Sequence, residues 1–187
     1  MPHIIHPSSL VWSHPQSSPA LTQPPRVHGA AGWQLNVHAY RRTPSLGFRY
    51  ASDTRGTHPF IPVIRAEIVG CPQFPTTLPT LDELIGLDGV TVDNVAAALL
   101  ERTAEPRDHV FTLHAELEGA RLSGVLDQLL TGWKAQGFAL GPVHLLRDAV
   151  EPLALARCWA GLARINGRAG TLLMQGDEFL GDVDAAR

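Results

Sequence analysis

Residues 90–137 read VTVDNVAAALLERTAEPRDHVFTLHAELEGARLSGVLDQLLTGWKAQG, and this stretch decides the fold class. Its first part carries apolar residues at helical spacing, so we expect a helix from Val90 to Glu101. The run 109–114 is rich in β-branched and aromatic residues, which predicts a buried strand. From Leu122 to Gln136 the apolar residues again share one face, and Gly137 is a typical stop, so a second helix is expected.

The segments on either side continue this alternation. Residues 138–140 predict a short strand, Pro142 is expected to open a brief helix at its first position, and residues 143–150 repeat the apolar spacing of a helix. Residues 46–84 are interrupted by five prolines, which predicts loops with short strands. Alternating strands and helices are typical of α/β proteins, in which crossovers rather than hairpins join parallel strands. We therefore expect an α/β fold.

Composition limits the classes of function. The chain has 187 residues, a formal charge of -3, 44% hydrophobic and 18% charged residues, which fit one ordinary globular domain. It has no cluster of Lys and Arg, so nucleic acid is not an expected partner. Its apolar runs are far shorter than the roughly 18 residues of a membrane span, and it shows no export signal. Two cysteines favour a reduced, cytoplasmic protein.

Residues 1–28 differ from the rest, because Pro, Ser and His recur there without a helical or strand period. We interpret this stretch as coil, a disordered or non-homologous leader, and expect residues up to about 20 to be poorly ordered. Its histidines His3, His6, His14 and His28 are conceivable metal ligands. They lack Cys or acidic partners at fixed spacing, so a leader without a metal site is the favoured interpretation.

His114 is the strongest candidate for chemistry. It ends an apolar run and precedes Glu116 and Glu118. In parallel α/β sheets the carboxyl ends of strands form the ligand face, so a histidine beside two carboxylates suits acid/base work. A histidine satisfied at a strand end, with both glutamates solvated, is an equally good interpretation of the pattern alone.

A second candidate group follows a short apolar run at residues 50–51. Asp53 there can orient a histidine, and Arg55 can hold an anion, although a simple Ser-Asp-Gly turn is favoured by the pattern alone. Trp33 ends a turn of small residues and can stack on a sugar ring. Single tryptophans more often serve packing.

Four blocks occur in a fixed order along the chain: Ala30–Trp33, Arg49–Gly56, Leu78–Glu83 and His114–Gly119. Together they resemble the polysaccharide deacetylase superfamily of NodB-like proteins, and within it the 4-deoxy-4-formamido-L-arabinose-phosphoundecaprenol deformylases. The resemblance extends from about residue 29 to about residue 174. It implies a partial, irregular (β/α) barrel at residues 29–180, with the N-terminal strands missing and residues 181–187 as a tail.

The resemblance also implies a chemistry. Relatives hydrolyse an amide with a divalent metal that an Asp and two His hold, while another His protonates the leaving amine. His114 matches that acid. The metal ligands belong to the part without a counterpart here, so none is identifiable in this sequence. The residues expected to bind or orient substrate are Trp33, Asp53, Arg55, Glu116 and Glu118.

Two departures from the family bear on activity. Gln34 stands where the deformylases carry an Arg, and no Asp-rich first strand is present. We therefore expect a truncated hydrolase that is inactive alone, or else a non-catalytic, sugar-binding remnant. The implied substrate is an amino sugar linked to polyprenyl phosphate in lipid A modification, which implies peripheral association with the inner face of the bacterial inner membrane. We also expect His114, Asp53 and Trp33 to converge at one rim of the sheet.

Overall fold

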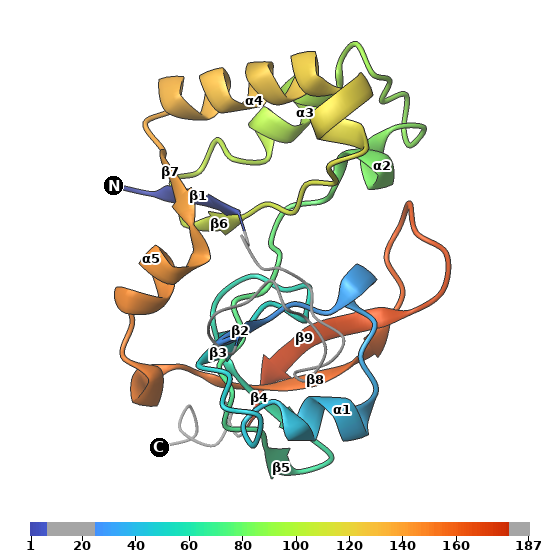
Figure 1. Cartoon of the computed structure of the whole chain (residues 1–187). Helices are drawn as coiled ribbons and strands as arrows, with labels where there is room; N and C mark the ends of the chain where they lie inside the picture. Colours follow the sequence, from blue (N-terminus) through green and yellow to red (C-terminus); the bar gives the residue numbers. More distant parts are fainter. Residues whose placement is uncertain (7–24, 180–187) are drawn as a thin grey trace, which may run out of the picture. The chain divides into compact units, whose positions relative to one another are not determined.

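A computed structural model describes residues 1–6 and 25–179 of the chain (Figure 1). The described residues form two compact units, each built from separate stretches of sequence. Unit 1 holds residues 1–6, 76–146 and 164–170, and unit 2 holds residues 25–75, 147–163 and 171–179.

Unit 1 contains a three-stranded parallel sheet with β1 (His3–His6) between β6 (His109–Val110) and β7 (Ala139–Pro142). Ile4 lies opposite His109 on one side and Leu140 on the other. The interpretation of residues 3–6 as coil is therefore wrong. Partners on both sides satisfy the backbone polar groups of β1, and they come from sequence positions that no local pattern connects to it. The stretch 7–24 lies outside the described residues.

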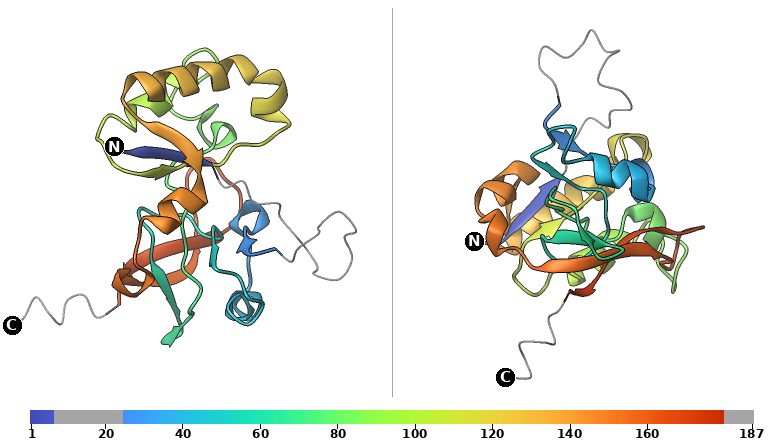
Figure 2. Two further views of the ribbon diagram at one scale, coloured as in Figure 1. Left: turned by 60° about the vertical axis from the view of Figure 1, so that its left-hand side comes forward. Right: turned by 90° about the horizontal axis from the view of Figure 1, so that it is seen from below.

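Helices α3 (Val95–Glu101) and α4 (Ser123–Ala135) lie side by side over this sheet (Figures 1 and 2). The prediction for α4 is confirmed, whereas α3 begins five residues later than expected from Val90. Asn94 explains the difference, because its Oδ1 accepts a hydrogen bond from Thr91 N at 2.7 Å and its Nδ2 donates to Gly89 O at 3.2 Å. These bonds hold a turn in place of the first helical turn.

Two further short helices belong to unit 1: α2 (Leu81–Leu84) and the π-helix η2 (Leu117–Arg121). A third, α5 (Val143–Asp148), begins in unit 1, and its last two residues belong to unit 2. The predicted strand at 109–114 is confirmed only at its first two residues, since 111–114 continue without strand partners. The segment is not helical, so the α/β assignment holds.

The core of unit 1 forms where α3 and α4 meet the sheet. Trp133 on α4 is 1% exposed, contacts the Phe111 ring edge-on at 5.3 Å, and donates its indole N–H to Thr103 Oγ1 at 3.2 Å. Such a buried aromatic pair, with its one polar atom satisfied, fixes the helix against the sheet. The same core contains Ile4, Leu78, Leu81, Val95, Leu99, Leu129 and Phe138.

Unit 2 contains a four-stranded sheet in the order β5 (Glu67–Ile68), β4 (Ile61–Ile64), β8 (Arg157–Ala163) and β9 (Leu172–Glu178). Only β4 and β8 are parallel; β8 and β9 form an antiparallel pair, which the expectation of crossovers without hairpins missed. A separate parallel pair joins β2 (Val27–His28) to β3 (Tyr50–Ala51). The remaining elements are η1 (Ala31–Trp33), α1 (Val37–Arg42) and η3 (Pro152–Ala154).

The chain is therefore a mixed α/β protein, and the short strands expected between residues 46 and 84 are present. Within 1–6 and 25–179 the strands close no barrel. The boundaries at residues 28 and 180 stay a prediction. Over the same described residues, no helix combines the length and the apolar character that crossing a membrane requires.

Gly167 in unit 1 offers a test of local packing. It has φ +81°, and a Cβ there would overlap the carbonyl oxygen of Glu83. Gly170 has the same φ of +81° with nothing within 4 Å of its Cβ position. Gly170→Ala should therefore cost about 1–2 kcal/mol from backbone strain, and Gly167→Ala a further ~1–3 kcal/mol from the overlap. Urea denaturation of both variants measures the free energy of unfolding. An equal decrease in the two variants would contradict the prediction.

Candidate functional site

His114 lies in unit 1, just before η2. Its backbone N–H donates to Glu118 Oε2 at 2.7 Å, and its Nδ1 lies 3.6 Å from Asp82 Oδ1. The second distance suits an ion pair but is too long for a hydrogen bond. The side chain is 32% exposed, whereas Nδ1 itself is buried and has no hydrogen-bond partner among the described residues. The exposed fraction of the side chain therefore lies on atoms other than Nδ1.

Glu118 is 1% exposed, so the interpretation of both glutamates as solvated is wrong for this residue. The π-helix η2 turns its carboxylate inward, and π-turns often mark functional positions. Oε2 accepts from the backbone of His114, while Oε1 is buried without a hydrogen-bond partner in the described part of the chain. A buried oxygen of this kind can accept a hydrogen bond from a ligand or a water. Glu116, two residues earlier, is exposed.

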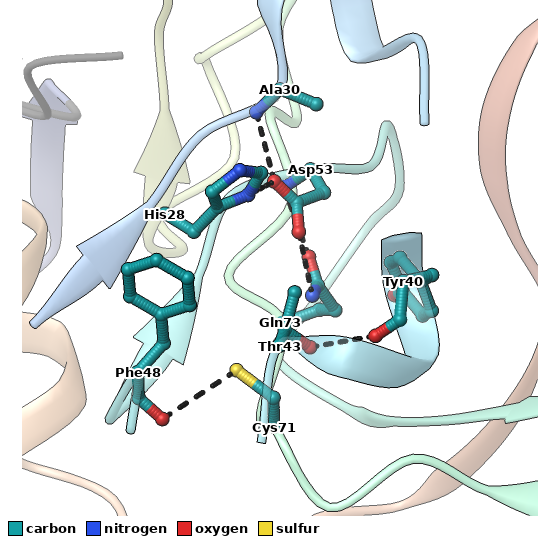
Figure 3. A network of polar contacts seen from close by, with 8 residues as sticks. All are labelled: His28, Ala30, Tyr40, Thr43, Phe48, Asp53, Cys71 and Gln73. Atoms are coloured by element: carbon teal, nitrogen blue, oxygen red, sulfur yellow. Dashed lines mark hydrogen bonds and ion pairs between the residues drawn. The ribbon is translucent and has the colours of Figure 1, made fainter. Parts of the chain in front are cut away.

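A second polar cluster lies in unit 2 around Asp53, which is 0% exposed (Figure 3). Asp53 Oδ1 accepts from His28 Nδ1 at 2.6 Å and from Ala30 N at 2.8 Å. Gln73 binds the residue twice, because its Oε1 accepts from Asp53 N at 2.9 Å and its Nε2 donates to Asp53 Oδ2 at 3.4 Å. The Asp53 carboxylate therefore lies in the interior of unit 2 and makes more hydrogen bonds than an aspartate in a surface turn needs.

The strands β2 and β3 create this pairing. His28 lies opposite Ala51 in their parallel register, and Ser52 N donates to His28 O at 2.9 Å. The residue after Ser52 is Asp53, so the register brings the histidine beside the carboxylate. The prediction that Asp53 follows a short strand is confirmed, and the histidine that it holds is His28.

Trp33 and Arg55 form a cation–π pair in the same unit. The Arg55 guanidinium carbon lies 4.7 Å from the centroid of the Trp33 ring. Trp33 is 3% exposed and Arg55 8%, so both side chains are largely covered. Trp33 has φ 56° after Gly32 with φ 61°, which confirms the predicted tight turn. The suggested roles in sugar stacking and anion binding stay predictions.

The candidate residues thus fall into two groups, each described within its own unit. Glu116 and Glu118 lie near His114 in unit 1, while Trp33, Asp53 and Arg55 belong to unit 2. Convergence of the two groups stays a prediction. The partner Gln73 was not predicted, because its two bonds to Asp53 depend on folding and leave no sequence motif.

The metal that the resemblance implies finds no ligand set among these residues. Across residues 1–6 and 25–179, no three His, Cys, Asp or Glu side chains come together in a group suited to hold a metal ion. The described residues therefore do not fit such a site. Cys71 and Cys158 are both buried free thiols.

Two comparisons with known proteins gave different kinds of result. No protein-family model matches the chain. A protein of Shewanella sediminis (strain HAW-EB3) named "Probable 4-deoxy-4-formamido-L-arabinose-phosphoundecaprenol deformylase ArnD" is 34% identical over 118 residues, 63% of this chain. A protein of the same name from Wigglesworthia glossinidia brevipalpis is 29% identical over 109 residues, 57% of this chain.

This chain is a relative of the ArnD deformylases. The matches span 37% and 38% of the two relatives' own lengths, so the chain corresponds to well under half of each. The resemblance inferred from the four sequence blocks is thereby confirmed. A match of this length does not by itself transfer the activity, substrate or partners of the complete ArnD proteins to this chain.

Proposed function

We propose that this chain provides the proton-donating part of an amide hydrolase that removes a formyl group from an amino sugar on polyprenyl phosphate, in lipid A modification. The observation that carries the proposal is the arrangement at His114. Its backbone is fixed by the buried Glu118, its Nδ1 lies 3.6 Å from Asp82, and a third of its side chain is exposed. The similarity to the two ArnD proteins supplies the substrate class.

The proposed chemistry concerns the second half of amide hydrolysis. When the tetrahedral intermediate collapses, the nitrogen of the leaving amine must gain a proton before the C–N bond breaks. His114 is the proton donor in this proposal. Asp82 is the positioning residue, because a carboxylate near Nδ1 can orient the ring so that Nε2 faces the leaving nitrogen.

The carboxylates near His114 suit a sugar. Glu118 Oε1 is a buried acceptor without a hydrogen-bond partner in the described residues, and Glu116, two residues before it, is exposed. Carboxylates accept hydrogen bonds from hydroxyl groups, which a sugar offers in several directions. In this proposal Trp33, Asp53 and Arg55 orient the substrate. The protein associates peripherally with the membrane that holds the lipid-linked sugar. The divalent metal that the similarity implies finds no fitting ligand set among the described residues, so this proposal assigns it no step.

A chimera tests the proposal. The matching part of the Shewanella sediminis protein is exchanged for this chain, and formate release from the formamido sugar is measured. We expect turnover that His114→Ala lowers by about 10²–10⁴-fold, the usual contribution of a general acid. His144→Ala is the matched control, because this exposed histidine of unit 1 lies on α5.

Each outcome of that assay has a meaning. Equal loss in both variants would point to damaged folding, which circular dichroism of the two proteins detects. Full activity of the His114→Ala chimera would exclude His114 as the acid. A chimera that binds the sugar without releasing formate would favour the alternative of a sugar-binding remnant.

A further inference from the structure

His28 and Asp53 have the geometry of an acid–base dyad. The Nδ1–Oδ1 distance of 2.6 Å is that of a short, charge-assisted hydrogen bond. Because a carboxylate can only accept, Nδ1 of the neutral ring must carry the proton. Asp53 cannot turn away, since Ala30 N and Gln73 Nε2 also donate to its oxygens.

The other ring nitrogen of His28 remains available. Within residues 1–6 and 25–179, Nε2 of His28 makes no hydrogen bond, and 17% of the side chain is exposed. The Phe48 ring packs against the imidazole with centroids 5.1 Å apart, which restricts its rotation. One nitrogen is therefore committed to Asp53 and the ring is held in place, which leaves Nε2 as an acceptor for a molecule arriving from solvent.

The surroundings favour proton exchange near neutral pH. The hydrogen bond to Asp53 raises the pKa of His28 above its usual 6.5, although burial acts in the opposite direction. The other titratable groups near Asp53 are Tyr40 and Cys71. Burial raises the pKa of Tyr40 well above 10.0 and that of Cys71 to about 12, so both stay uncharged at neutral pH. They do not compete with His28 for the proton.

We infer that His28 is a second proton-transfer residue of this protein, with Asp53 as its positioning residue and a water or sugar hydroxyl as its ligand. As the ligand oxygen attacks a carbonyl carbon, its O–H bond breaks and the proton moves to Nε2. The new C–O bond forms, and the electron pair of the C=O bond moves to the carbonyl oxygen. Asp53 stays ionised and stabilises the imidazolium. Only the carbonyl substrate is taken from the proposed function; the dyad rests on unit 2 alone.

Nuclear magnetic resonance of the ¹⁵N-labelled full chain tests the dyad directly. We expect His28 to titrate above pH 6.5 and its neutral ring to carry the proton on Nδ1. Asp53→Asn should lower the midpoint toward the usual value. A neutral ring protonated on Nε2, or a midpoint unchanged in Asp53→Asn, would overturn the inference.

Chemical modification and kinetics test the availability of Nε2. Diethyl pyrocarbonate, which acylates neutral imidazole, should modify His28 as well as the exposed His38 of α1; modification of His38 alone would overturn the inference. In the chimera, His28→Gln should lower kcat by about 10²-fold and remove the limb of the pH profile that reports a base, whereas His38→Gln should not. An unchanged kcat in His28→Gln would overturn the catalytic role. If the chimera is inactive while the resonance and modification results hold, the proposed function fails and the dyad stands.

Discussion

Trp133→Ala is expected to lower the free energy of unfolding of unit 1 by about 3–5 kcal/mol, the range for deleting a large buried aromatic side chain. Trp133 on α4 is 1% exposed, belongs to the core that also contains residues of α3 and β1, and contacts the Phe111 ring edge-on. Alanine leaves a cavity that two packed helices cannot close. The variant also removes the donor that binds Thr103 at 3.2 Å.

Urea denaturation followed by far-ultraviolet circular dichroism measures this loss without relying on tryptophan fluorescence. Trp133→Phe is the graded control, because it keeps most of the apolar volume and loses the hydrogen bond to Thr103, which costs about 1 kcal/mol. A midpoint of unfolding that is the same in Trp133→Ala as in the unmodified chain would show that this core is not what holds unit 1 together.

Asp53→Ala should destabilise unit 2 by about 3–5 kcal/mol, the cost of breaking a buried ion pair by removing one partner. The substitution leaves His28 Nδ1, Ala30 N and Gln73 Nε2 without their acceptor in an interior position. Asp53→Asn keeps the shape of the side chain and one carbonyl oxygen, so it should destabilise unit 2 by less than Asp53→Ala. Denaturant titrations of both variants give the comparison; equal stability of Asp53→Ala and the unmodified chain would contradict it.

The same pair predicts a pH dependence. The pKa of His28 is raised in the folded state. Its contribution to the free energy of unfolding is therefore fully present below the pKa of the unfolded chain, 6.5, and is lost as pH rises through the pKa of the folded protein. The stability difference between the unmodified chain and Asp53→Asn should therefore be larger at about pH 6 than at about pH 8, on the two sides of the ordinary histidine pKa. A difference that grows with pH would show that the pair does not raise the pKa of His28.

Local patterns predicted the elements that depend on local interactions. Helix α4 follows from one apolar face and the stop at Gly137, which has φ +88°. The turn at Ala30–Trp33 follows from its small residues. The start of α3 was placed too early, because the bonds that Asn94 makes with its own turn compete with the helix. That competition concerns side-chain geometry, which an apolar repeat does not report.

The kinds of functional group were also visible in the sequence, while their partners were not. An aspartate following a short strand predicted a carboxylate able to orient a histidine, and His114 with its glutamates predicted an acid/base cluster. Burial of Glu118, at 1% exposure, depends on a π-turn that brings its side chain inward. The sequence alone predicted that glutamate equally well as solvated.

By itself the sequence determined the α/β class, the main helices, the relationship to the ArnD deformylases and the residue types available for chemistry, because all of these depend on order and spacing along the chain. Only the tertiary structure decided that residues 3–6 form the central strand of a sheet and that His28 is the partner of Asp53. The strand depends on Val110 and Leu140 lying on either side of it, and the dyad depends on the register of β2 with β3. Contacts between residues so far apart in sequence form only when backbone hydrogen bonds and a shared core bring them together, and no local pattern records them.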